Sequence, residues 1–248
     1  MVYDESMAAG YDRGRRLRTG DLDTWMAAAR PYLPGAGGWI LDLGAGTGRF
    51  GPALAGATGA TVVAQEPSAA MRAVCRANCP GLPIVGGTAQ AMPFRDHAFD
   101  AVWASQVIHH ITDLTAFAAS LRRVLRPGGH LLLRGGFGPP DELPLFRWFP
   151  EAWATGAVAA SLAEIGDVLA AAGLTQIDHV RVQQMSAASP DELLDKVRAR
   201  SLSHLAALPD AVFQRGLRAM ERDTRTGAVP HHLTEHLDLV VFRAVPRS

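Results

Sequence analysis

Two histidines stand side by side in the stretch WASQVIHHITD, residues 103–113. An imidazole titrates near neutral pH, so His109 or His110 can accept a proton from a hydroxyl group that is about to react. Histidine also binds metal ions, but adjacent residues point in different directions in a strand and in a helix, and the two rings cannot readily share one ion. The pair therefore indicates either a general base or residues that shape a pocket.

A glycine-rich turn, ILDLGAGTGRF at residues 40–50, holds the second group of candidate residues. Glycine has no Cβ, so Gly44 and Gly46 let the backbone approach a ligand closely. Asp42 precedes the first glycine by two residues, which gives the pattern Asp-x-Gly-x-Gly-x-Gly. This pattern differs from the Gly-x-Gly-x-x-Gly turn of dinucleotide-binding folds. The turn predicts a ligand site where a strand passes into a helix.

A parallel sheet is expected to position these residues. Apolar runs bounded by glycine are typical of buried parallel strands, and stretches with a 3.6-residue apolar period between them indicate helices. The predicted strands are 39–43, 61–66, 82–87, 99–105 and 130–136, and the predicted helices are 20–33, 67–78 and 113–129. We expect Asp21 or Asp23 to cap the first helix, Pro67 to lie in the first turn of the second, and residues 126–129 (RPGG) to end the third.

The second half of the chain changes character after Gly135. Residues 137–156, rich in proline and aromatic side chains, predict an irregular insert; a helix is expected at 161–174, a strand at 177–185, a helical segment at 190–226 and a last strand at 236–245. The predicted fold class is α/β: a Rossmann-like, seven-stranded, mostly parallel sheet with helices on both faces, an antiparallel last strand and helical cap inserts. Inserts at the carboxyl edge of such a sheet commonly form substrate pockets.

Charge and composition exclude several classes of function. The 248-residue chain has a formal net charge of zero, which argues against a broad electrostatic contact with nucleic acid. No apolar stretch is long enough to span a bilayer, and the acidic N-terminal stretch lacks the apolar region of a signal peptide. Cys75 and Cys79 are expected to be reduced thiols, because disulfide geometry is poor at a four-residue helical spacing. We expect a cytoplasmic monomer or homodimer with no metal, membrane or nucleic-acid partner.

Four stretches in order, LDLGAGTG, AQEPSAAM, GGTAQAMPFRDHAFDAVWAS and LRRVLRPGGHLLL, resemble the class I methyltransferases that depend on S-adenosylmethionine (SAM). The small-molecule subgroup near the ubiquinone and menaquinone methyltransferases is the most similar, over residues 36–134. The resemblance implies SAM as cofactor and transfer of its methyl group to an O, N or C atom of a small-molecule acceptor in specialised metabolism. It also implies one class I domain over 1–248, with N-terminal cover helices at 1–35, a SAM-binding core at 36–136 and substrate-side inserts at 137–160 and 186–234.

The same resemblance assigns donor-binding roles to individual residues. Gly44, Ala45 and Gly46 would lie against the methionine part of SAM, and Asp42 would orient the turn or hold the amino group through water. Glu66, at the end of the second strand, can accept hydrogen bonds from both ribose hydroxyls. Further contacts are expected from Tyr11 and Arg16 of the cover helix, from Pro67 and Met71 on the adenine, and from Thr88, Ala89, Gln90 and Ser105.

Two of these positions depart from the family pattern. Relatives usually have Asp where Thr88 stands and Glu where Gln90 stands. A threonine hydroxyl accepts a hydrogen bond from the adenine amino group without the help of a charge, so we expect binding to persist but to be weaker. The alternative is that the backbone, for example the N–H of Ala89, holds this edge of the adenine.

A group of natural-product O-methyltransferases also resembles this chain at the paired histidines. Those enzymes have an acidic residue just after the fifth strand, whereas Arg134 and Gly135 occupy that place here. It therefore stays open whether His109 or His110 removes a proton or whether both only line the methionine pocket. Other candidates for the acceptor side are Trp148, Phe149, Trp153, Arg200, Ser203, His204, His231, His232 and His236.

Two other functions are compatible with parts of this pattern. A SAM-binding protein that does not methylate, such as a cyclase or a regulatory binder, keeps the same glycine turn. A nicotinamide-dependent oxidoreductase has a similar sheet, but Asp42 before the turn and the Leu-Arg-Pro-Gly-Gly stretch favour the methyltransferase. Nucleic-acid methylation is not expected, because no Asn/Asp-Pro-Pro-aromatic sequence follows the fourth strand.

Overall fold

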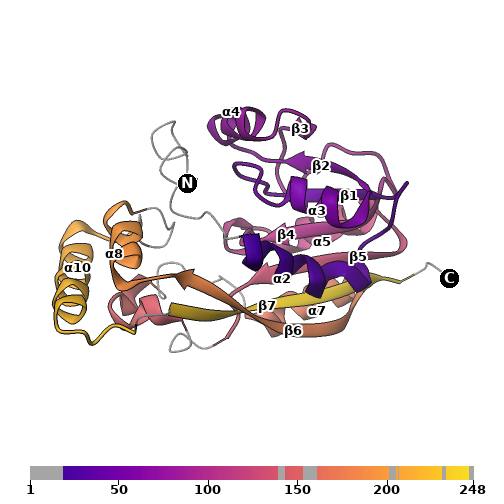
Figure 1. The fold of residues 1–248 in the computed structure, drawn as a ribbon. Coiled ribbons are helices and arrows are strands. Elements are labelled where there is room, and N and C mark those ends of the chain that lie inside the picture. The colour runs from indigo at the N-terminus through magenta and orange to yellow at the C-terminus, as the bar shows by residue number, and fades with distance from the viewer. Residues whose placement is uncertain are drawn as a thin grey trace.

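A seven-stranded sheet with the order β3-β2-β1-β4-β5-β7-β6 organises the part of the chain that the computed structural model describes (Figure 1). That part comprises residues 19–138, 143–152, 161–200, 205, 207–230 and 233–245. The strands are β1 (Trp39–Leu43), β2 (Thr61–Gln65), β3 (Ile84–Val85), β4 (Phe99–Ser105), β5 (Leu125–Gly135), β6 (Leu174–Ala187) and β7 (Leu233–Ala244). β7 pairs antiparallel with β5 and β6, and the other neighbours pair in parallel. The predicted fold class is confirmed, including the antiparallel last strand.

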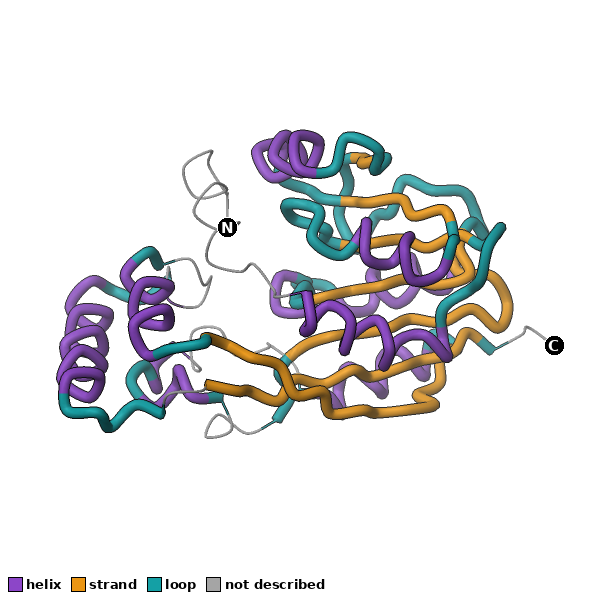
Figure 2. Tube along the Cα trace, in the orientation of Figure 1, coloured by secondary structure: helices purple, strands orange, loops and turns teal. Residues whose placement is uncertain are grey.

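Helices cover both faces of this sheet (Figure 2). They are α2 (Thr19–Ala29), α3 (Gly51–Thr58), α4 (Ala69–Asn78), α5 (Leu114–Val124), α7 (Leu162–Ala171), α8 (Pro190–Arg198) and α10 (Asp210–Arg225), with 3-10 turns η1 (Arg30–Tyr32), η2 (Ile108–His110) and η4 (Pro144–Arg147). On one face α5 and α7 bury Phe117 and Ile165 against the strands. On the other face α2 and α3 bury Trp25 and Leu54. Both faces of the parallel strands are therefore dry, as their continuous apolar sequences require.

Residues 144–152, α8 and α10 form a separate helical cap, at the left end of Figure 1. The cap has its own buried cluster, which includes Trp148, Phe149, Leu193 and Phe213. The long strands β6 and β7 extend from the sheet to the cap. Since β6 runs parallel to β5, its last residue points to the carboxyl edge of the sheet, and the cap lies at that edge.

The boundaries of several elements differ from the sequence prediction. Neither Asp21 nor Asp23 caps the first helix, because α2 begins at Thr19 and the Asp21 carboxylate accepts the Met185 N–H at 3.1 Å. Pro67 lies outside α4, since Ser68 has an extended backbone and its hydroxyl accepts the Met71 N–H as the N-cap.

Three further differences come from strand pairing and chain reversal. The RPGG sequence at 126–129 does not simply end a helix: Leu125 already pairs with Phe99, so this sequence belongs to an irregular start of β5. The predicted third strand is only two residues long. The predicted helical segment at 190–226 is divided: among its described residues, α8 ends at Arg198 and α10 begins at Asp210.

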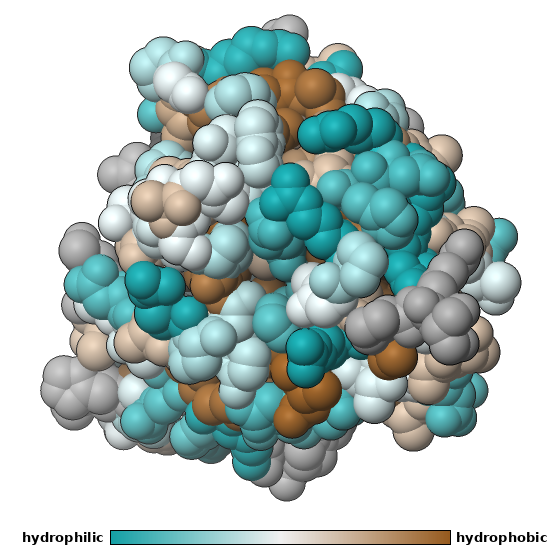
Figure 3. All heavy atoms as spheres, turned by 90° about the vertical axis from the view of Figure 1, so that its right-hand side faces the viewer, coloured by the Kyte–Doolittle hydropathy of each residue, from teal (hydrophilic) through white to brown (hydrophobic). Residues whose placement is uncertain are grey.

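The amino edge of the sheet faces the viewer in Figure 3. Hydrophilic residues cover much of it, and the apolar residues appear as separate patches. Among the described residues, the exposed large apolar side chains are those of Trp39, Ile177 and Val245, at 41%, 46% and 45% of their full exposure. Scattered apolar residues of this kind are ordinary on a protein surface. Among the described residues, no helix is both long and apolar enough to cross a membrane.

Candidate active site

The glycine-rich turn lies at the carboxyl ends of β1 and β2. The N–H groups of Gly44 and Ala45 both donate to the Gln65 carbonyl, at 2.8 and 3.0 Å. Gly44 has a φ of 68°, and a Cβ on it would come within 2.8 Å of the Val107 side chain. Only glycine accepts both this conformation and this contact. The turn is therefore held between the end of β2 and the exit of β4.

Glu66 stands directly beside this turn and is nearly buried, with 7% of its surface exposed. Its carboxylate accepts the N–H of Gly46 at 3.0 Å and the N–H of Ser68 at 2.9 Å. Burial raises the pKa of Glu66 above its usual value, and these two N–H groups oppose the rise. A carboxylate has about four lone-pair positions, so two remain for ligand hydroxyls.

Asp42 is the second buried carboxylate of the turn, with 2% of its surface exposed. Burial, assisted by the negative charge of Glu66, raises the pKa of Asp42 to about 7, against a smaller opposing effect of Arg49 and of the Gly51 N–H. Its Oδ2 atom is buried without a hydrogen-bond partner among the described residues. A buried acceptor without a donor is costly, and a ligand ammonium group or a water would satisfy it.

These features fit a ligand that has an ammonium group at one end and ribose hydroxyls further along. The unpaired Asp42 oxygen offers an acceptor for the ammonium group, directly or through water. Glu66 has acceptor positions left for the hydroxyls, and the Gly44 turn lets the ligand approach the backbone. The residues present therefore suit SAM, with Asp42 toward its ammonium group and Glu66 toward its ribose.

The expected adenine side is formed by the start of α4 and by residues 88–90. Met71 is buried and Pro67 is exposed. The Thr88 carbonyl accepts the Gln65 side-chain amide at 2.9 Å and the Ala91 N–H at 3.2 Å. Ala89 is 8% exposed, and the Gln90 amide donates to Thr112 at 3.4 Å. The Ala89 contact and the role of Thr88 stay predictions.

Gln65 is a residue that the sequence analysis missed. It is fully buried, its carbonyl holds the glycine turn and its amide holds Thr88. Its Oε1 atom has no partner among the described residues. A glutamine at the end of a mostly apolar strand (TVVAQ) was the available signal, because buried polar side chains are retained where they make hydrogen bonds.

The paired histidines form the short 3-10 turn η2 directly after the exit of β4. Their ring centroids are 4.0 Å apart with an interplanar angle of 50°. His109 is partly buried and His110 is exposed. Across the described residues, no group of three or more His, Cys, Asp or Glu side chains is arranged to hold a metal ion.

An acidic residue of the neighbouring strand lies opposite the place at the end of β5 where the similar O-methyltransferases have an acid and this chain has Arg134 and Gly135. Asp238 of β7 pairs in register with Gly135 and is 3% exposed. Its carboxylate accepts the Phe137 N–H at 2.8 Å and lies 2.7 Å from Nε2 of His179. Asp238 therefore holds the chain where it leaves β5. No sequence pattern indicated it, because the pairing joins residues about a hundred positions apart.

Other sequence candidates have different surroundings. Trp148 and Phe149 belong to the buried cluster of the cap. Arg200 pairs with Asp210 at 2.6 Å, and its guanidinium lies 3.9 Å from the centroid of the Phe213 ring. His236 is exposed on β7. The remaining candidates lie outside the described residues: Tyr11, Arg16, Trp153, Ser203, His204, His231 and His232.

Comparison with known proteins decides the family of the core. Residues 41–133 match the family model described as a methyltransferase domain. This region is a class I, SAM-dependent methyltransferase domain. The match contains the Gly44 turn, Glu66 and the paired histidines.

Known relatives of this methyltransferase domain agree with that assignment. The demethylmenaquinone methyltransferase of Clavibacter sepedonicus is 38% identical over 151 residues, which are 59% of this chain and 60% of that protein. The chain thus covers less than two thirds of that relative's length. A candidate methyltransferase from an antibiotic biosynthesis pathway of Anabaena variabilis has a similar structure, with a TM-score of 0.74 and 21% identity over 89% of this chain and 96% of that one.

A structure with a different named activity shares the fold. The 4+2 cyclase SpnF matches with a TM-score of 0.61 and 22% identity, over 94% of this chain and 84% of that one. At such low identity these two structural matches show the fold alone. The residues of the site must therefore carry the argument about chemistry.

Proposed function

We propose that this protein transfers the methyl group of SAM to a small-molecule acceptor. The observation that carries the proposal is the pair of buried carboxylates at the glycine turn. Asp42 has a buried oxygen that no described residue pairs with, and Glu66 lies just after β2 with two lone-pair positions left for a ligand. The methyltransferase domain match supports the same activity.

When bound, SAM supplies a methyl group on a positively charged sulfur, which a nucleophile can displace in line. The protein's part in such a reaction is to align the acceptor with this methyl group and to exclude water. The turn and Glu66 hold the donor. The cap lies at the same edge of the sheet and is our candidate for the acceptor side, as the predicted inserts at 137–160 and 186–234 suggested.

We propose an aromatic acceptor with an ionisable hydroxyl group, of the quinol type. The relative from Clavibacter sepedonicus is named a demethylmenaquinone methyltransferase, and this name supports an acceptor of the quinol class. A quinol ring becomes a better nucleophile at carbon or oxygen when its hydroxyl loses a proton. The position of His109 and His110 directly after β4 supports one of them as the base, within reach of an acceptor at the carboxyl edge.

Ligand-dependent thermal unfolding tests the donor. We expect S-adenosylhomocysteine (SAH) to raise the Tm, by the stabilisation that any ligand of the native state confers, and NAD to leave the Tm unchanged. Stabilisation by NAD alone would overturn the proposal.

Formation of SAH from SAM tests the acceptor. A higher rate of SAH formation with a demethylated naphthoquinol than with an amine would support the acceptor class. Retained SAM with no SAH formed from any acceptor in a broad panel would favour a protein that binds SAM without methylating.

A further inference from the structure

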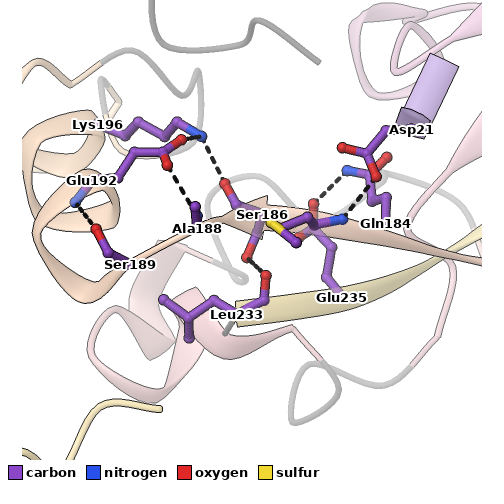
Figure 4. Close-up of polar contacts among 10 residues, drawn as sticks. Asp21, Gln184, Ser186, Ala188, Ser189, Glu192, Lys196, Leu233 and Glu235 are labelled. Carbon is purple, nitrogen blue, oxygen red and sulfur yellow. Dashed lines mark hydrogen bonds and ion pairs between the residues drawn. The ribbon is translucent and has the colours of Figure 1, made fainter. Parts of the chain in front are cut away.

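A buried series of hydrogen bonds joins the exit of β4 (residues 105–107) to β6 and β7, the strands that carry the cap. Arg134, on β5, is 2% exposed, and its guanidinium donates to the Ser105 hydroxyl at 3.1 Å and to Oε1 of Gln184 at 2.5 Å. Its Cζ atom lies 4.3 Å from the centroid of the Trp25 ring. Gln184, on β6, extends this series of hydrogen bonds to β7, because its Nε2 donates to Glu235 at 2.6 Å (Figure 4).

The chemistry of its neighbours defines the orientation of the Gln184 amide. Arg134 and the Trp25 ring can only donate, and both point at Oε1, with the Trp25 contact at 2.9 Å. Glu235 accepts from Nε2. Turning the amide over would place donors against donors. Gln184 is 7% exposed, so water cannot easily replace these partners.

Arg134 also acts on the exit of β4 through its backbone. Its carbonyl accepts the Gln106 N–H at 2.8 Å. Gln106 has a φ of 54°, a conformation that is uncommon outside glycine and needs support from its surroundings. The next residue, Val107, lies against Gly44 of the donor turn. Arg134 therefore contacts both residues that precede Val107.

We propose that Arg134 and Gln184 are positioning residues that hold the exit of β4, and with it the Gly44 turn, in the shape that binds the donor. The inference rests on the proposed function, because the donor is SAM. Arg134 acts on the donor site through Ser105 and Gln106. Gln184 holds Arg134, and through Glu235 it links the donor site to β7. Donor affinity is then coupled to the strands that carry the cap.

The first test is Gln184→Met, measured as the affinity for SAH by titration calorimetry. We expect the Kd to rise roughly 3- to 30-fold, the range over which residues of a coupling network act. The matched control is Gln183→Met, on the same strand, whose exposed side chain donates to the Thr234 hydroxyl at 3.3 Å. The control should bind SAH within about twofold of the unchanged protein.

A paired exchange separates positioning from simple loss of stability. Gln184→Glu combined with Glu235→Gln keeps an acceptor toward Arg134 and Trp25 and restores a donor between the two strands. The double variant should recover most of the SAH affinity, whereas Gln184→Glu alone places two carboxylates together and should not. Circular dichroism and Tm are measured for every variant.

Unchanged SAH affinity in Gln184→Met, with a lowered Tm, would overturn the proposal in favour of a structural role. Equal losses in Gln183→Met and Gln184→Met would overturn it as well. If the unchanged protein fails to bind SAH, the proposed function fails instead, so the two failures are distinguishable.

Discussion

The donor edge, by which we mean the Gly44 turn with Asp42, Glu66 and residues 105–107, and the helical cap are stabilised in different ways. At the donor edge, backbone N–H groups, left-handed glycines and two buried carboxylates set the shape. In the cap, a buried apolar cluster lies inside and ion pairs such as Arg215–Glu151 lie exposed outside. Exposed ion pairs contribute about 0–1 kcal/mol each, so the apolar cluster holds the cap. We infer that the donor edge tolerates few substitutions and that the cap tolerates those that preserve its volume.

The paired histidines should give the largest effect, if one is the base. Replacing His109 and His110 with alanine one at a time should lower kcat by about 10²- to 10⁴-fold in one variant and a few-fold in the other. Single-turnover methyl transfer measures this step without product release. Near-unchanged turnover in both variants would contradict a general base at η2.

Gly44→Ala tests the rigidity of the donor edge. The new Cβ would lie 2.8 Å from Val107 and require a φ of 68°, so the turn must shift. We expect SAH affinity or kcat/KM to fall on the order of 100-fold, as for other misplaced sites. Gly56→Ala is the control, since nothing lies within 4 Å of its Cβ position on α3, and it should stabilise the protein by up to about 1 kcal/mol. Normal SAH binding by Gly44→Ala would show that the turn is adaptable.

Gly216→Ala is the corresponding substitution in the cap. Its Cβ would come within 2.4 Å of the Phe149 ring, and Phe149 is fully buried. Overpacking should destabilise the cap by roughly 1–3 kcal/mol and raise the KM for the acceptor. SAH affinity should stay within about twofold. A large loss of SAH affinity here would mean that packing inside the cap, and not only the strands β6 and β7 that carry it, sets the donor affinity.

Asp42→Asn should have a smaller effect on stability, and its sign depends on pH. The pKa of Asp42 is raised from 3.8 to about 7, so the folded protein binds a proton that the unfolded chain releases, and stability falls as the pH rises from about 4 to about 7. The asparagine variant lacks this loss. Without ligand it should melt a few degrees above the unchanged protein at pH 8 and show a smaller advantage at pH 5. A lower Tm than the unchanged protein at both values would contradict this account.

The same variant should bind SAM more weakly at pH 8, because the ammonium group would lose a charged partner. Higher stability with lower affinity is the expected combination for a buried functional carboxylate. Unchanged affinity would remove Asp42 from the donor site.

Much of the donor edge was predictable because its signals are local. The runs 39–43 and 99–105 were predicted to the residue, since each is a short apolar segment with clear flanking residues. The glycine spacing and Glu66 follow directly from positions along the chain. The roles of the donor-binding residues remain predictions, and Tyr11 and Arg16 lie outside the described residues.

Residues that act through long-range pairing were not predictable in this way. Gln184, Asp238 and Arg134 belong to different strands, and their contacts depend on a register that no local pattern reveals. The long β6 was predicted too short because its alternation is broken by two bulges. The boundaries of α4 and α5 depended on a cap and on a strand pair, both of which compete with helix propensity.

The sequence by itself determined the alternation of strands and helices, the glycine turn and the identity of the acids beside it, because these depend on neighbours along the chain. Only the tertiary structure decided that Asp42 is buried with an oxygen that no described residue pairs with, that Gln65 holds the turn, and that β7 supplies an acid opposite Gly135. Burial and register arise from packing between distant segments. They set the electrostatics of the site, which residue spacing alone does not contain.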